Sequence, residues 1–225
     1  MNESDELQPW LAPGRYVDSA HPAVADFARA KAPAGDAREI AVALYYAVRD
    51  GIRYDPYRID LTPEGLTASR CLANGYGFCV TKAALLAAAL RVHGIAARLG
   101  FADVRNHLTS ERLRRTMGTD LFTFHGYTEI RLDGHWVKAT PAFNLSLCER
   151  AGTHPLEFDG RSDSILQPFD VGGRRHMEYV RERGSFADVP REEIIRDWDT
   201  TYPPTVEWKR DAGHADFESE VRGGD

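Results

Sequence analysis

Two side chains in the 225-residue sequence have the chemistry of a nucleophile and its base, Cys79 and His125. Cys79 follows a glycine-containing stretch, residues 75–78, and apolar or small residues then recur at helical spacing as far as Leu90. Gly94 can adopt a left-handed conformation and end this predicted helix. A thiol in the first turn meets unpaired amides and the positive end of the macrodipole, so we expect a lowered thiol pKa. The other interpretation is a small apolar core residue at a helix start.

His125 belongs to a predicted strand, residues 122–132, which is followed by a strong hairpin signal. Asp133-Gly134 favours a two-residue type I′ turn, and residues 135–140 form the predicted return strand. Side chains alternate along a strand, so the two faces of the first strand are predicted from the residue numbers. One face carries Phe122, Phe124, Ile130 and Leu132, and the other, more polar face carries His125, Tyr127 and Glu129.

The predicted turn also determines which residues pair across the hairpin. If residues 133 and 134 form the turn, Leu132 faces His135 and Tyr127 faces Thr140. Thr140 is then the diagonal neighbour of His125, roughly 7–8 Å away between backbones. A catalytic Cys–His pair requires a partner of this kind, because the imidazole must be held in one orientation.

Four motifs, in this order, resemble the core of the transglutaminase-like family: Gly-Phe-Cys at 77–79, Gly-Ile-Ala-Ala-Arg at 94–98, His-Gly-Tyr-Thr-Glu at 125–129 and Asp-Gly-His-Trp-Val at 133–137. The resemblance covers about residues 40–145. It implies the architecture that this family shares with papain-like cysteine proteases. By position, it also implies that Cys79 is the nucleophile and His125 the general base.

The sequence departs from the family pattern at the orienting carboxylate. The family usually has Trp-x-x-x-Asp-Pro, whereas Thr140 stands in the aspartate position here, after Trp136 and before Pro141. Threonine can accept a hydrogen bond from an imidazole, but it cannot stabilise imidazolium by charge. Thr140 is the predicted third member by position. Asn144 is the alternative, because papain-like enzymes use asparagine as the orienting residue.

The helix start also indicates where the oxyanion of an acyl-transfer reaction would be held. The simplest donor is the backbone N–H of Cys79, and Asn74 or the Tyr76 hydroxyl is a candidate second donor. The sequence has no Gly-rich phosphate loop, no Gly-x-Ser-x-Gly elbow and no tight Cys or His pair of the zinc-binding kind. We therefore predict no cofactor and no metal.

The amino-acid composition is typical of a globular protein. The apolar fraction of 43% and charged fraction of 28% are typical, and no apolar run of about 18 residues predicts a membrane span. The acidic, polar beginning is unlike a secretory signal, and three cysteines without framework spacing favour reduced thiols. We expect a cytoplasmic protein. The formal net charge of −6 lies mostly at the two ends, which leaves no basic surface for nucleic acid.

Helical patterns come first and strands follow, which favours an α+β fold. Helices are predicted from Pro22 to about Lys31, from a capping box at Asp36 and Glu39 to residue 51, and after Pro190. With the family resemblance, this predicts N-terminal helices and a catalytic helix packed on an antiparallel sheet. Residues 145–185 show no sustained periodicity. We expect one domain over residues 1–200 and an acidic, loosely ordered tail over residues 201–225.

The leading hypothesis is a cysteine enzyme that hydrolyses an amide or peptide bond, or transfers its acyl group, through a thioester on Cys79. The partner would be a peptide, a protein or a small amide, with no nucleic acid or membrane involved, and the sequence leaves the oligomeric state open. The alternative is a non-catalytic interaction module that keeps the fold but has lost the triad carboxylate.

Overall fold

The computed structural model describes residues 3–106, 111–166, 169–174, 176–203 and 217–220. Its helical segments are α1 (Glu3–Leu7), the 3-10 turn η1 (Gln8–Trp10), α2 (Pro22–Lys31), α3 (Ala37–Gly51), α4 (Ala68–Asn74), α5 (Cys79–Val92), α6 (Glu111–Met117), α7 (Leu145–Ala151), α8 (Arg191–Thr201) and α9 (Phe217–Glu220). Its strands are β1 (Arg53–Tyr54), β2 (Tyr76–Gly77), β3 (Ala97–Asn106), β4 (Leu121–Leu132), β5 (His135–Ala139) and β6 (Met177–Phe186).

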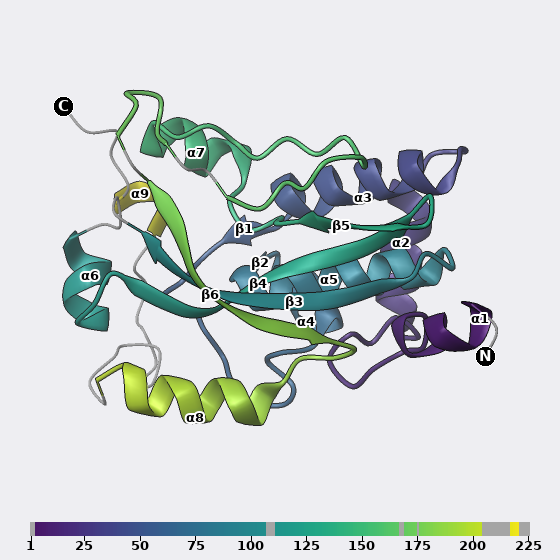
Figure 1. The fold of residues 1–225 in the computed structure, drawn as a ribbon, viewed down its shortest axis with the longest axis horizontal. Helices are drawn as coiled ribbons and strands as arrows, with labels where there is room; N and C mark the ends of the chain where they lie inside the picture. The colour runs from purple at the N-terminus through teal and green to yellow at the C-terminus, as the bar shows by residue number, and fades with distance from the viewer. Residues whose placement is uncertain (1–2, 107–110, 167–168, 175, 204–216, 221–225) are drawn as a thin grey trace.

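The main sheet is antiparallel, with strand order β5-β4-β3-β6, and β1 and β2 form a separate parallel pair. Figure 1 shows α2, α3, α4 and α5 gathered on one side of this sheet, with α8 along its lower edge. The predicted α+β class is confirmed, because helices come first in the chain and the strands of the sheet follow. Within the described residues, no helix is both long enough and apolar enough to cross a membrane.

The central helix is α5, which contacts β3, β4 and three other helices. Every residue from Cys79 to Arg91 is buried, as expected for a helix that is apolar around its whole circumference. Arg91 is one of the few polar exceptions, and its guanidinium donates to backbone carbonyls of Ala12 (2.8 Å), Ala97 (2.8 Å) and Ala187 (2.6 Å). These bonds join segments near both ends of the chain to the end of α5.

The predicted hairpin is confirmed. Leu132 pairs with His135, and Thr128 pairs with Ala139, in the register that the turn position required. Asp133 and Gly134 have φ angles of 48° and 79°, as a type I′ turn demands. The predicted helices are confirmed as well, and α3 begins with the reciprocal bonds of a capping box.

A bulge in β4 changes the predicted faces of this strand. Ala102 pairs with His125, whereas Val104 pairs with Phe122, so two residues of β4 oppose the single residue Asp103. Phe124 lies in this bulge with a φ of 53°. The extra residue reverses the alternation, so the prediction that Phe122 and Phe124 share a face is wrong. Phe122 instead lies on the face of His125.

The face of β4 that carries His125, predicted as the more polar one, is buried. Tyr127 packs in a small apolar cluster with Val104 and Met177, and Glu129 is 4% exposed and pairs with Arg98. Leu147 of α7 and Met177 of β6 lie next to this face, and the sequence pattern predicted neither of these elements. In the predicted tail, residues 204–216 and 221–225 lie outside the described residues, and Phe217 is a buried residue of α9.

A lysine buried beneath α3 makes stability depend on pH. Lys82 donates from Nζ to the backbone carbonyl of Arg49 at 2.9 Å and to that of Ile52, and burial lowers its pKa from 10.5 to about 7. Between about pH 7 and pH 9 the unfolded chain therefore binds this proton more tightly than the folded chain. The free energy of unfolding should rise with pH in this window, by up to roughly 1.4 kcal/mol per pH unit.

Replacing the amine tests this expectation. We predict that Lys82→Met removes the rise, whereas Lys31→Met, at an exposed position of α2, retains it. Urea unfolding at several pH values in the window measures the slope for each protein. A slope in Lys82→Met equal to that of the wild type would assign the pH dependence to other groups.

Candidate active site

The start of α5 is held by its own third residue. The Thr81 hydroxyl accepts a hydrogen bond from the Phe78 N–H at 3.1 Å, which satisfies a donor at the helix start. Gly77 precedes this turn, and a Cβ there would lie 2.6 Å from Thr81 Oγ1 and 2.7 Å from Cys71 Sγ. The glycine thus lets the chain pass close to the helix, and Cys79 becomes the first helical residue.

A second glycine brings the first turn of α5 against β4. A Cβ on Gly126 would lie 3.1 Å from the Cα of Val80 and 3.4 Å from the carbonyl oxygen of Cys79. Two residues further along β4, the Thr128 hydroxyl donates to the carbonyl of Ala83 at 3.0 Å. Helix and strand therefore meet backbone to backbone, and the Gly126 N–H lies within hydrogen-bonding reach of the Cys79 sulfur.

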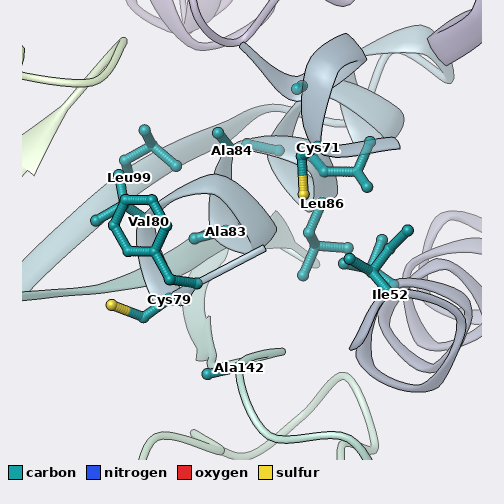
Figure 2. Packing of buried hydrophobic residues seen from close by; sticks show 14 of the residues in the cluster. Ile52, Cys71, Cys79, Val80, Ala83, Ala84, Leu86, Leu99 and Ala142 are labelled. Atoms are coloured by element: carbon teal, nitrogen blue, oxygen red, sulfur yellow. The ribbon is translucent and has the colours of Figure 1, made fainter. Parts of the chain in front are cut away.

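This contact places Cys79 and His125 on one cavity of about 400 Å³, which we call the thiol cavity. Figure 2 shows the Cys79 sulfur pointing away from the packed side chains of α5, whereas the Cys71 sulfur points into them. The structure thus brings together the two residues predicted as nucleophile and base. Their catalytic roles remain predictions.

Two aromatic residues, one in α8 and one directly after it, also line the thiol cavity. These residues are Trp198 and Tyr202, and both form hydrogen bonds with the bulge of β4. Trp198 Nε1 donates to the Thr123 carbonyl at 3.2 Å, and the Tyr202 hydroxyl accepts from the Thr123 N–H at 2.8 Å. Sequence reasoning did not identify either residue. Their spacing of four was the available signal, since such residues share a face if the helix predicted after Pro190 continues that far, but Tyr202 was assigned to the predicted tail.

Burial dominates the protonation of the candidate pair. It raises the pKa of the Cys79 thiol to about 11, and the nearby backbone N–H groups lower that pKa only in part. It also lowers the pKa of His125 to about 4. The expected low thiol pKa is therefore wrong, because the cost of a buried thiolate exceeds the benefit of the helix start. At neutral pH both groups are uncharged.

Thr140, the predicted third member, contacts other groups than His125. Its hydroxyl donates to the Ile165 carbonyl at 3.1 Å, its N–H donates to the Ser164 carbonyl at 2.8 Å, and its carbonyl accepts from the Tyr45 hydroxyl at 3.2 Å. Beyond Ala139 the chain pairs with Ser164 and no longer with β4. Thr140 therefore joins the end of β5 to the segment that follows α7.

Asn144, the alternative third member, forms hydrogen bonds with β1 and α7. Its Oδ1 accepts from the Tyr54 N–H at 3.0 Å, and its Nδ2 donates to the Ser146 hydroxyl at 2.8 Å. Among the residues that the structure describes, neither Thr140 nor Asn144 forms a hydrogen bond with the His125 ring. The orienting role predicted for them thus has no contact to support it.

The candidate side-chain donors for an oxyanion lie elsewhere. Asn74 and Tyr76 line a separate cavity of about 410 Å³ on the other side of the helix start, together with Arg58 and Arg70. The structure does not bring them to the thiol cavity. The backbone N–H groups of Cys79 and Val80 remain at the helix start beside the sulfur.

A cysteine at a helix start and a histidine on the adjoining strand, both lining one cavity, form a potential Cys–His site. The sequence profile of the transglutaminase-like superfamily matches residues 25–141. The chain belongs to the transglutaminase-like superfamily.

Two solved structures are similar to the chain, each at low sequence identity. One is a protein named "putative cysteine protease" from Cytophaga hutchinsonii, 15% identical, with a TM-score of 0.48 over 82% of this chain and 55% of that chain. The other is a protein named "putative protease" from Parabacteroides distasonis, 18% identical, with a TM-score of 0.39 over 63% of this chain and 26% of that chain. This chain thus spans little more than half of the first protein and about a quarter of the second. No curated protein matches it.

The raised thiol pKa leads to a prediction for alkylation. We expect the rate constant for iodoacetamide at Cys79 to rise about tenfold per pH unit from neutrality and to level off only near the thiol pKa of about 11. Peptide mapping distinguishes Cys79 from the buried Cys71 and Cys148. A rate constant that is already high and constant between pH 5 and pH 8 would instead indicate a thiolate–imidazolium pair.

The contacts of Thr140 lead to a second prediction. Thr140→Val should lower the free energy of unfolding by about 1–3 kcal/mol, because the Ile165 carbonyl loses its buried donor. The pH dependence of Cys79 alkylation should not change. Tyr45→Phe is the control, since its hydroxyl donates to the Leu156 carbonyl at 2.8 Å and its side chain does not line the thiol cavity. If only Thr140→Val shifted the alkylation profile, Thr140 would orient His125.

Proposed function

We propose that the chain is a cysteine enzyme that hydrolyses an amide or peptide bond, or transfers its acyl group, through a thioester on Cys79. The observation that carries this proposal is the shared thiol cavity, which holds a cysteine at a helix start and a histidine on the adjoining strand. Membership of the transglutaminase-like superfamily supports it. A peptide, a protein or a small amide is the proposed substrate.

The proposed reaction starts from two uncharged groups. As the Cys79 sulfur attacks the carbonyl carbon, its proton passes to the imidazole of His125, and backbone N–H groups at the start of α5 stabilise the oxyanion. The C–N bond then breaks, and the imidazolium gives its proton to the leaving nitrogen. Water, or an acceptor amine, next attacks the thioester while His125 takes its proton, and the thiol is restored when the acyl group leaves.

A specific observation favours a second candidate function, that of a binding module without catalysis. His125 is buried with a pKa of about 4, and no described residue donates a hydrogen bond to its ring or accepts one from it. A carboxylate in that position would stabilise the imidazolium that the reaction forms. Without one, the same cavity can bind an acyl compound and leave its bond intact.

Intact-mass spectrometry with a panel of esters, amides and peptides separates these functions. We predict that the acyl group of a substrate adds to the protein, that Cys79→Ala abolishes the adduct and the turnover, and that Cys71→Ala retains both. His125→Ala should reduce the acylation rate by about 10²–10⁴-fold, the usual contribution of a general acid–base group. Turnover that survives Cys79→Ala would exclude the proposed mechanism. Binding without any adduct across the panel would favour the second candidate.

A further inference from the structure

A second cavity, of about 600 Å³, is also lined by His125. We call it the histidine cavity, because His125 lines it and Cys79 does not. The two cavities share a wall formed by His125, Phe122, Tyr54 and Leu113. A molecule that spans both cavities would thus pass directly along the imidazole.

The chemistry of the histidine cavity favours an uncharged, apolar occupant. Residues such as Phe143, Leu147, Ala151 and Met177 form most of its lining, and among the described residues that line it there is no Asp, Glu, Lys or Arg. The polar residues of the lining, Asn106, Thr153, His176 and His125, carry no permanent charge, so a charged group placed there would lose its hydration without gaining a permanently charged partner. An aliphatic or aromatic group, in contrast, gains from leaving water.

Phe217, in the C-terminal part of the chain, already places an aromatic side chain in the lining of the histidine cavity. Phe217 packs edge-on against Tyr54 and Tyr57, with ring centroids 5.9 and 5.5 Å apart, and Glu218 pairs with Arg150 at 3.7 Å. Figure 1 shows α9 at the same end of the sheet as α6, which contributes Leu113. The lining of the histidine cavity therefore accommodates an aromatic side chain carried by a peptide segment.

The direction of proton transfer assigns a role to this cavity. In the proposed reaction the acyl carbon is bonded to Cys79, whereas the leaving nitrogen must lie within hydrogen-bonding reach of His125. The group attached to that nitrogen then extends past the imidazole, away from the sulfur. We propose that the histidine cavity is the leaving-group subsite and selects amides whose amine half bears an apolar or aromatic side chain. This inference rests on the proposed function.

Two small amides with the same acetyl half test the subsite directly. N-phenethylacetamide carries an aromatic amine half, and N-acetyl-β-alanine carries a carboxylate in a comparable place. Binding is measured by saturation-transfer NMR on full-length Cys79→Ala protein, in which no thioester can form. N-phenethylacetamide should bind, and N-acetyl-β-alanine should bind at least about tenfold more weakly because its charge loses hydration.

Substitutions at Ala151 locate the bound probe. In the Cys79→Ala background, Ala151→Trp should weaken binding of N-phenethylacetamide about tenfold or more by filling the cavity, and Ala151→Leu should weaken it less. The smaller variant also provides the test if the larger one does not fold. Ala30→Trp, at an exposed position of α2 that lines neither cavity, should bind like the parent.

The results separate this inference from the proposed function. Equal binding of the two probes, or a folded Ala151 variant that binds like Ala30→Trp, overturns the subsite. If acylation of wild-type Cys79 is found alongside that result, the proposed function survives and the subsite alone is excluded. If the probe binds as expected but Cys79 is never acylated, the leaving-group role is overturned together with the proposed function.

Discussion

The backbone contact between the first turn of α5 and β4 is the constraint on which the candidate site depends. Gly126 allows it, since any Cβ there would lie 3.1 Å from the Cα of Val80. The bond from Thr128 to the Ala83 carbonyl continues the contact along the helix. Because no side chain separates the two elements, the Cys79 sulfur lies beside the amide that directly follows His125. The relative position of Cys79 and His125 therefore depends mainly on the absence of a side chain at Gly126.

The bulge in β4 is the second constraint, and it is held from outside the strand. Phe124, with a φ of 53°, is in a conformation that costs a non-glycine residue about 1–3 kcal/mol. Asp103 accepts a hydrogen bond from its N–H at 3.2 Å, and Arg183 of β6 binds both Asp103 and Asp197 of α8. The bulge therefore connects β6 and α8 to the site, and it turns Phe122 toward both cavities.

The parts of the fold that follow from local rules could be predicted from the sequence. The hairpin register follows from Asp133-Gly134, and the start of α3 follows from its capping box. The bulge could not be predicted in this way, because it depends on the pairing of β4 with β3, a strand whose other edge pairs with β6. The strand β6 itself was missed, since it is an edge strand with many exposed, charged residues and no clear alternation.

The candidate site was predictable to the same extent. Cys79 and His125 could be singled out because helix position and strand parity are local properties. The contacts of Thr140 could not be predicted, because it leaves the hairpin to pair with Ser164, a partner far away in the sequence. The protonation states of Cys79 and His125 could not be predicted from the sequence either, since both pKa values depend on how completely the rest of the chain buries the two groups.

The burial that opposes an ion pair at rest has a different effect during the proposed reaction. Moving a proton from a thiol with a pKa of about 11 to an imidazole with a pKa of about 4 is uphill, by about 1.4 kcal/mol for each unit of separation. Sulfur attack and proton transfer must therefore occur together. Once formed, however, a buried imidazolium of low pKa is a strong acid. An amide nitrogen leaves only when it is protonated, so the same burial that weakens His125 as a base favours it as the acid in the step that breaks the C–N bond.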